Sequence, residues 1–344
     1  MNILVTGANG FVGRALIKEL LDAGHTVTAL IRNEGSAPKI KDVKWIQGDL
    51  LDSSSLPKLK SMDKAFYLVH GLKSDANKFE YDEALAAVNF INWVRSSSPD
   101  IVYLGGLGPD TGEESPHLRS RHLTGAILGS SGLPVTEFRA SIILGGGSLS
   151  FEMVKAIAER FPFLPDMKIL SEPCQPLALQ DLLKYLVGAL EISPKGHDII
   201  EIGGPDVSTY GELLEIYSEL SGIKRKKVKL PEVETKVLIK AMDYAIPEHS
   251  QIGKKLVESL SYPTVVKNHH ARKVFPEIHP LDLRSAMDIA KSNSDTKYPP
   301  IWEKDFLKTL LSDKILTQSG FLSPELLKNL EKVGRIKDIL SRKS

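Results

Sequence analysis

The stretch "ILVTGANGFVG", residues 3–13, decides the fold of this chain. A short apolar run ends at Gly7, and Gly10 and Gly13 follow at intervals of three. Gly7 permits a tight turn, Gly10 lets a backbone approach a pyrophosphate, and Gly13 lets a helix pack closely on a strand. Phosphates then lie against the positive N-terminus of that helix. The stretch therefore predicts a strand, a phosphate-binding turn and a helix; the alternative is a glycine-rich turn without a ligand.

The alternation of strand and helix continues as far as residue 140. Short β-rich runs are separated by runs with apolar residues at helical spacing, as in Val12, Leu16 and Leu20. Such alternation predicts a parallel sheet with helices on both faces. We expect strands at residues 2–6, 25–31, 43–47, 65–69, 101–104 and 135–139, and helices at residues 11–23, 53–60, 76–95 and 116–130.

After Gly145 this rhythm breaks into helical runs separated by turns rich in proline and glycine. The fold class we predict is therefore α/β: a Rossmann-type, doubly wound parallel sheet with a smaller, mainly helical second domain. We place the nucleotide-binding domain at residues 1–203, with residues 145–170 contributing to the second domain. The helical substrate or cap domain covers residues 204–294, and a helical extension covers residues 295–344.

Composition excludes several classes of protein. The 344 residues include 42% hydrophobic ones, and 44 Lys/Arg against 43 Asp/Glu leave a net charge of +1, so we expect no nucleic-acid partner. The N-terminus has no basic segment before its apolar run, so we expect no signal peptide. No apolar run reaches the roughly 18–20 residues of a transmembrane segment. Cys174, the only cysteine, fits a reducing compartment, so we expect a cytoplasmic protein.

The second predicted strand ends in "TALIRN", residues 28–33. A site that prefers NAD usually has an acid here, which binds the ribose 2′-hydroxyl. This chain has Arg32 instead, and Arg14 follows the third glycine of the turn. Two guanidinium groups suit a 2′-phosphate, so the pattern favours NADP(H) over NAD(H). The alternative is two solvated arginines.

Two further stretches contribute candidate cofactor contacts. In "QGDLLD", residues 47–52, Asp49 can accept a hydrogen bond from an adenine amino group while Leu50 packs on the ring. The alternative is that Asp49 or Asp52 only caps a helix. In "YLVHGL", residues 67–72, Val69 and His70 end the fourth strand and are expected near the nicotinamide; the alternative for His70 is a hydrogen-bonded histidine at a strand end.

These motifs resemble the short-chain dehydrogenase/reductase superfamily, in its extended and atypical branches. "TGANGFVG" (6–13) matches its glycine pattern, "GDLLD" (48–52) its adenine-contact motif, and "EFRASIILGGGS" (137–148) its sixth strand and loop. "YLGGLG" (103–108) with "HLRSRHLTGAIL" (117–128) points to the atypical group that includes the dehydrogenase-like accessory subunit of respiratory complex I. The resemblance implies an NAD(P) site formed by Thr6, Gly7, Asn9, Gly10, Phe11, Val12, Gly13, Arg14, Arg32, Asp49, Leu50, Val69, His70 and Arg121.

Active members of the superfamily use Tyr-x-x-x-Lys on the helix after the fifth strand, with a serine at the end of that strand. Carried over to this chain, the tyrosine position is His117, the lysine position is Arg121, and the serine position is Gly105 or Gly106. Arg121 can still donate to ribose hydroxyls, but it cannot shuttle protons. His117 can serve as a proton donor, and it is our candidate catalytic residue.

Three interpretations of "HLRSR" (117–121) remain open. We favour an NADP(H)-binding protein with little or no turnover, which acts as a sensor, scaffold or assembly factor for a protein partner. The alternative is an NADPH-dependent oxidoreductase or epimerase-like enzyme that acts on a small carbonyl or quinone-type substrate. The third is a structural helix with solvated basic groups. Peripheral membrane contact stays open, and no metal site is predicted, because adjacent His269 and His270 lack further spaced ligands.

Overall fold

The computed structural model describes residues 1–70, 78–110, 114–161, 163–230 and 260–296. The chain divides into two compact units, and it passes between them several times. Unit 1 comprises Met1–Ile143, Gln175–Pro205 and Thr264–Leu281. Unit 2 comprises Leu144–Cys174, Asp206–Pro263 and Asp282–Ser344.

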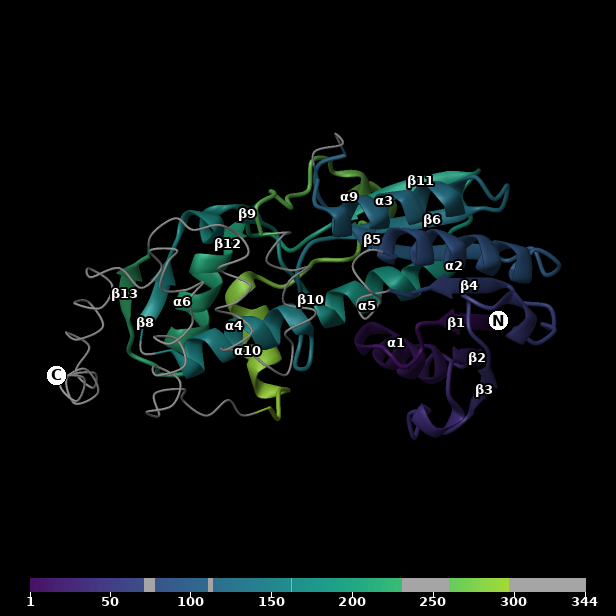
Figure 1. Ribbon diagram of the computed structural model, residues 1–344, viewed down its shortest axis with the longest axis horizontal. Helices are drawn as coiled ribbons and strands as arrows, with labels where there is room; N and C mark the ends of the chain where they lie inside the picture. The colour runs from purple at the N-terminus through teal and green to yellow at the C-terminus, as the bar shows by residue number, and fades with distance from the viewer. Residues whose placement is uncertain (71–77, 111–113, 162, 231–259, 297–344) are drawn as a thin grey trace. The chain divides into compact units, whose positions relative to one another are not determined.

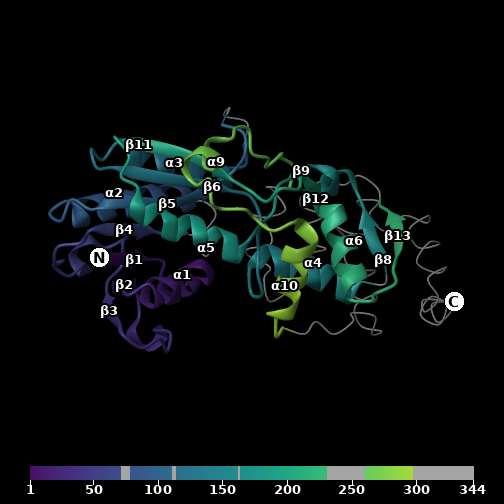
Figure 2. The same cartoon turned by 180° about the vertical axis from the view of Figure 1, so that it is seen from behind.

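Unit 1 contains a seven-stranded sheet in the order β11-β6-β5-β4-β1-β2-β3, and all of its strand pairs are parallel (Figures 1 and 2). The order reverses at β1, since the chain continues to β2 on one side and β4 pairs with β1 on the other. In such a sheet, ligands bind outside the carboxyl ends of the strands at the reversal point. The strands are β1 (Asn2–Thr6), β2 (Thr26–Ile31), β3 (Val43–Gln47), β4 (Lys64–Tyr67), β5 (Asp100–Gly106), β6 (Val135–Ala140) and β11 (His197–Ile202).

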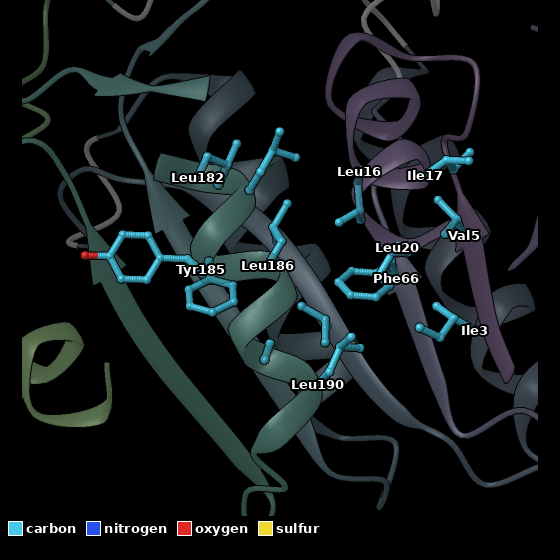
Figure 3. Packing of buried hydrophobic residues seen from close by; sticks show 14 of the residues in the cluster. Ile3, Val5, Leu16, Ile17, Leu20, Phe66, Leu182, Tyr185, Leu186 and Leu190 are labelled. Atoms are coloured by element: carbon cyan, nitrogen blue, oxygen red, sulfur yellow. The ribbon is translucent and has the colours of Figure 1, made fainter. Parts of the chain in front are cut away.

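Helices cover both faces of this sheet because its strands are apolar on both sides. Ile3 and Val5 of β1 belong to one buried cluster, whereas Leu4 between them belongs to another. The first cluster lies under α1 (Phe11–Asp22) and α5 (Leu179–Gly188); Figure 3 shows Leu16 and Leu20 of α1 beside Phe66 of the sheet, with the leucines of α5 across the same core. The second lies under α2 (Phe79–Val94), and α2 packs against α3 (Pro116–Gly129). Short helix α9 (His270–Val274) lies by β11.

Unit 2 combines helices with pairs of short strands. β8 (Phe163–Asp166) pairs in parallel with β13 (Lys226–Lys229), and β9 (Pro173–Cys174) pairs antiparallel with β12 (Ser208–Thr209). Its helices are α4 (Leu149–Arg160), α6 (Tyr210–Leu220) and α10 (Leu283–Ser292). Thr209 and Glu212 form a capping box at the start of α6. The remaining short elements are β7 (Ile143–Leu144), β10 (Leu177–Ala178), η1 (Glu34–Ser36), η2 (Ser53–Ser55), η3 (Lys168–Ser171) and η4 (Ala189–Glu191).

One predicted helix is wrong. Instead of a helix over residues 53–60, the chain forms only the 3₁₀ turn η2 and then continues without helical structure through Pro57. Proline disfavours helical backbone at the residue before it, so the turn ends at Ser55 and Leu56 is extended. The other strands and helices predicted before residue 140 are present with small shifts at their ends. Residues 76–77 of the predicted 76–95 helix, residues 231–259 of the predicted 204–294 domain and residues 297–344 of the predicted extension lie outside the described residues.

Candidate functional site

The turn between β1 and α1 requires glycine at two positions. Gly7 has a φ of 69°, and a Cβ on it would lie 2.3 Å from the carbonyl oxygen of Leu68, just after β4. A Cβ on Gly13 would lie 2.3 Å from the carbonyl oxygen of Gly7. The tight turn and the close approach of α1, which the sequence predicts for these two glycines, are both present.

The first turn of α1 has no side-chain cap. Gly10 is its N-cap residue, and the Gly10 amide donates to the Gly7 carbonyl at 2.9 Å. The first amides of a helix have no partner within that helix, so the amides of residues 11–13 are available to an external acceptor. A Cβ on Gly10 would meet only the Gly7 carbonyl oxygen, at 3.0 Å, so the space over this helix end is open. The geometry fits a bound pyrophosphate.

The other predicted residues of the turn divide between core and surface. Asn9 is exposed at the tip of the turn, and Phe11 and Val12 are half-buried at the start of α1. Thr6 is fully buried, and its hydroxyl donates to the carbonyl of Phe66 on β4 at 3.0 Å. The Thr6 side chain therefore joins the two strands at the reversal point of the sheet.

The two predicted arginines are exposed. Arg14 lies on the first turn of α1, and Arg32 directly follows β2 at the carboxyl edge of the sheet. The backbone carbonyl of Arg32 accepts a hydrogen bond from the Gln47 side chain at 3.2 Å, which joins the ends of β2 and β3. Neither guanidinium forms an ion pair with a described residue, so both are available to an anionic ligand.

Asp49 and Asp52 have different roles in the loop after β3. The Asp52 carboxylate caps η2 and accepts from the Ser54 amide at 3.0 Å. The Asp49 carboxylate uses one oxygen to accept from the Leu51 amide at 2.9 Å, and the side chain is half-buried. Leu50 is 4% exposed and belongs to the second core cluster. The adenine contacts of Asp49 and Leu50 remain predictions.

A buried polar group follows β4. Val69 and His70 are half-buried, and His70 Nδ1 lies 3.0 Å from Glu83 Oε1 of α2. The hydroxyl of Ser120, on α3, donates to the other oxygen of the same carboxylate. Burial would raise the pKa of Glu83, but hydrogen bonding and charge from His70, together with Arg121 and Ser120, lower the pKa to about 2. Glu83 therefore stays a carboxylate at neutral pH.

His117 lies against this group through its ring. The His117 and His70 rings are stacked, with centroids 4.7 Å apart and planes 29° apart. Phe79 of α2 lies on the same side, with its ring centroid 6.0 Å from that of His117. The structure thus brings together two histidines from separate stretches of the sequence.

Arg121 lies one helical turn beyond His117, as predicted, and its guanidinium contacts β5. The guanidinium donates to the carbonyl of Leu104 and lies over the Tyr103 ring, 5.4 Å from its centroid. The Tyr103 hydroxyl donates to the carbonyl of Arg121 at 2.9 Å. Burial raises the pKa of Tyr103 despite the nearby charge of Arg121, so this phenol stays neutral. The predicted ribose contact of Arg121 remains a prediction.

Gly105 and Gly106 at the end of β5 let neighbouring side chains approach closely. A Cβ on Gly106 would lie 2.8 Å from Leu118 of α3, and a Cβ on Gly105 would lie 3.1 Å from Glu137 of β6. Neither position offers a hydroxyl. The arrangement therefore packs α3 closely on β5 and β6.

Glu83 and Ser120 are not among the site residues that the sequence predicts. Glu83 shares the core-facing side of α2 with Phe79, Ala86 and Phe90, all buried. An acid at a core position of an amphipathic helix is the signal that indicates it, because such a charge needs a partner. Ser120 gives no comparable signal, because one buried serine in a helix is common.

The sheet and the glycine turn define a Rossmann-type protein of the dinucleotide-binding class. Within this class the chain is similar to atypical members of the short-chain dehydrogenase/reductase superfamily, in line with its sequence motifs. The NAD dependent epimerase/dehydratase family matches residues 3–103. The UDP-glucose 4-epimerase structure of Thermotoga maritima superposes with a TM-score of 0.63 at 14% identity, over 85% of this chain and 98% of that one, and confirms the fold.

Several curated relatives share part of the chain. Subunit 9 of the NADH dehydrogenase [ubiquinone] 1 alpha subcomplex of Arabidopsis thaliana is 21% identical over 70% of this chain and 63% of its own length. The photosystem II assembly factor Ycf39 of Synechocystis is 20% identical over 67% of this chain and 71% of its own. The 2-alkyl-3-oxoalkanoate reductase of Stenotrophomonas maltophilia is 28% identical over 46% and 56%. The chain spans between 26% and 63% of the length of the first curated relatives that it matches.

Two further residues noted in the sequence, Cys174 and His270, have structural surroundings that the structure describes. Cys174 is buried, and burial raises the pKa of its thiol to about 12. His270 begins α9, and its Nε2 lies 3.0 Å from the Asp198 carboxylate. In the part of the chain that the structure describes, no helix is long and apolar enough to cross a membrane.

Proposed function

We propose that this chain binds NADP(H) at the turn after β1 and acts as a cofactor-binding sensor, scaffold or assembly factor with little or no turnover. The uncapped start of α1 would hold the pyrophosphate. Arg14 and Arg32 would hold the 2′-phosphate, since both guanidinium groups are exposed and lack an ion-pair partner among the described residues. A nicotinamide cofactor supplies a hydride when it is bound.

The observation that carries this proposal is the set of residues at the usual catalytic positions. His117 and Arg121 occupy the tyrosine and lysine positions, and Gly105 and Gly106 occupy the serine position. Arg121 stays cationic and its guanidinium contacts Leu104 and Tyr103, so it can bind but cannot shuttle a proton. Two relatives are named as a subunit of a large complex and as an assembly factor, which supports a role through a protein partner.

A second function is favoured by the stacked histidines. His70 is hydrogen-bonded to the Glu83 carboxylate and stacks on His117, so the pair forms a group that can hold and pass a proton. An NADPH-dependent reductase or epimerase-like enzyme for a small carbonyl or quinone-type substrate would use His117 as its acid. The likeness to a 2-alkyl-3-oxoalkanoate reductase supports this alternative.

Oxidation of NADPH in the presence of small carbonyls and quinones separates the two functions. Wild type should bind NADPH and oxidise it no faster than buffer does. Brisk oxidation by wild type, with a loss of about a hundredfold or more in His117→Ala, would overturn the proposal in favour of the enzyme. His25→Ala is the matched control, because His25 precedes β2 at the opposite edge of the sheet.

Arg121 and His117 should also differ in binding. Arg121→Ala should weaken NADPH by roughly 1–3 kcal/mol if its guanidinium reaches the ribose, whereas His117→Ala should change affinity less. The same proposal includes a partner and a location. The partner is a protein and not a nucleic acid. The chain acts in the cytoplasm, and any contact with a membrane is at the membrane surface. Co-purification of the native protein with its partner from a fractionated cell extract tests both.

A further inference from the structure

Three potential ligand groups converge between β5 and α3 of unit 1. Asp110 and Glu114 follow β5. His122 lies on α3, directly after Arg121 in the sequence. One ligand atom from each of the three lies within 4.8 Å of the other two. Glu114 and His122 are each 7% exposed, whereas the Asp110 side chain is 61% exposed. The cluster is therefore buried on one side and open to solvent at Asp110.

The three groups are all acceptors. His122 Nε2 lies 3.1 Å from the carbonyl oxygen of Gly106, and because a carbonyl only accepts, this nitrogen carries the ring hydrogen. Nδ1 of the neutral ring then presents a lone pair, 3.6 Å from Asp110 Oδ1. His122 Nδ1 and Glu114 Oε2 are both buried, and neither has a hydrogen-bond donor among the described residues. A lone pair that faces carboxylates without a donor is satisfied by a positive charge held between them, either a metal cation or a proton.

The spacing suits a small cation. Zn²⁺ binds nitrogen and oxygen at about 2.1 Å, so two ligands of a tetrahedral site lie about 3.4 Å apart. The 3.6 Å between His122 Nδ1 and Asp110 Oδ1 matches this edge. A histidine that binds a metal usually donates its other ring nitrogen to a carbonyl or carboxylate, and the Gly106 carbonyl occupies that place here.

The cationic groups near the cluster pair with Asp110 and Glu137. Arg139 donates to Asp110 Oδ2 at 3.1 Å and to the fully buried Glu137 at 2.7 Å. Arg139 thus pairs with Asp110 and Glu137, and His197 Nε2 lies 2.7 Å from the other oxygen of Glu137, whereas no described cation pairs with Glu114. A divalent cation would neutralise Glu114, while Arg139 orients Asp110 through the oxygen that does not face the metal.

We propose that Asp110, Glu114 and His122 bind one divalent transition-metal ion, with Zn²⁺ the best fit. The imidazole ligand selects against Mg²⁺ and Ca²⁺, which prefer sites built from oxygen alone. Three protein ligands leave a fourth position for water on the exposed side of Asp110. The ion links Asp110 and Glu114, which follow β5, to His122 of α3. Its role is therefore to hold these two ligands beside the helix that carries His117 and Arg121.

Zinc titration of the full-length chain tests the proposal. The tag-free protein is treated with a chelator, dialysed, and titrated with Zn²⁺ in a calorimeter. Wild type should bind one Zn²⁺ per chain, and Mg²⁺ should bind far more weakly. Glu114→Gln and His122→Gln should each weaken Zn²⁺ by about a hundredfold, while the exposed His269→Gln control keeps wild-type affinity.

Two outcomes overturn the proposal. The first is a wild type that does not bind Zn²⁺ at one equivalent per chain. In that case a proton on one of the three ligand groups takes the place of the metal. The second is unchanged affinity in Glu114→Gln and His122→Gln, which would place the metal elsewhere. Circular dichroism of the metal-free variants checks their fold. If both buried substitutions unfold the protein, Asp110→Asn provides the same test, because the Asp110 side chain is largely exposed.

Discussion

At the scale of single residues, Arg32 carries the proposed preference for NADP(H). Its guanidinium is exposed at the end of β2, where an acid would bind the 2′-hydroxyl of NAD. The backbone at this point is fixed by the hydrogen bond from Gln47, so a substitution changes the side chain without moving the strand. Arg14 contributes a second exposed cation on the first turn of α1.

The first prediction is a preference for NADPH over NADH by about 1–3 kcal/mol, the range for charge-assisted hydrogen bonds. Arg32→Asp should narrow or reverse this preference, because it replaces an attraction to the 2′-phosphate by a repulsion. Calorimetric titration with both cofactors measures it. Lys195→Asp, an exposed position before β11, makes the same change of charge and should leave the preference intact. Equal affinity of the wild type for both cofactors would refute the assignment.

At the scale of elements, the Glu83 carboxylate holds α2 to α3 and to the segment after β4. It accepts a hydrogen bond from the Ser120 hydroxyl of α3, and it contacts His70, which follows β4. The folded-state pKa of about 2 lies below the ordinary value of 4.5. The charged form therefore stabilises the fold fully above pH 4.5, and this contribution is lost as the pH falls through 2.

The second prediction follows from the lowered pKa of Glu83 in the folded protein. The depression of the pKa corresponds to roughly 3 kcal/mol, so Glu83→Gln should lower the free energy of unfolding by roughly 1–3 kcal/mol at pH 7. The gap between the two proteins should shrink as the pH is lowered from 5 toward 2. Urea unfolding at several pH values measures it, with Glu80→Gln on the exposed side of α2 as the control. A gap that stays constant, or widens in acid, would disprove the role of Glu83.

The helices and strands differ in how well the sequence predicts them. The helix from Phe11 and the strand over Asn2–Thr6 follow from local patterns, because glycine spacing and apolar periodicity act within a few residues. The helix predicted over residues 53–60 is absent, since Pro57 limits it to a short turn. The stacking of His70 on His117 joins residues 47 positions apart in the sequence, and no local pattern indicates it. No local pattern indicates the contact between Glu83 and Ser120 either.

At the scale of the whole molecule, each compact unit is assembled from separate stretches of chain. Unit 1 receives β11 from Gln175–Pro205 and α9 from Thr264–Leu281, far from the first 143 residues. β11 pairs with β6 at the edge of the sheet, and α5 packs beside α1 on one face. The sheet that positions the site therefore depends on long-range pairings, which residue patterns alone do not specify.

The central claim is that the turn at Gly10 binds NADPH. Titration calorimetry of NADPH against wild type and Gly10→Val tests it most directly, because a side chain there occupies the space over the start of α1. Gly211→Val, in the first turn of α6, is the control, since a Cβ there meets only ordinary contacts. Wild type and control should bind one NADPH per chain, and a folded Gly10→Val should lose at least about 2.7 kcal/mol, a hundredfold in affinity. A wild type that binds no NADPH, or a folded Gly10→Val with full affinity, would contradict the account.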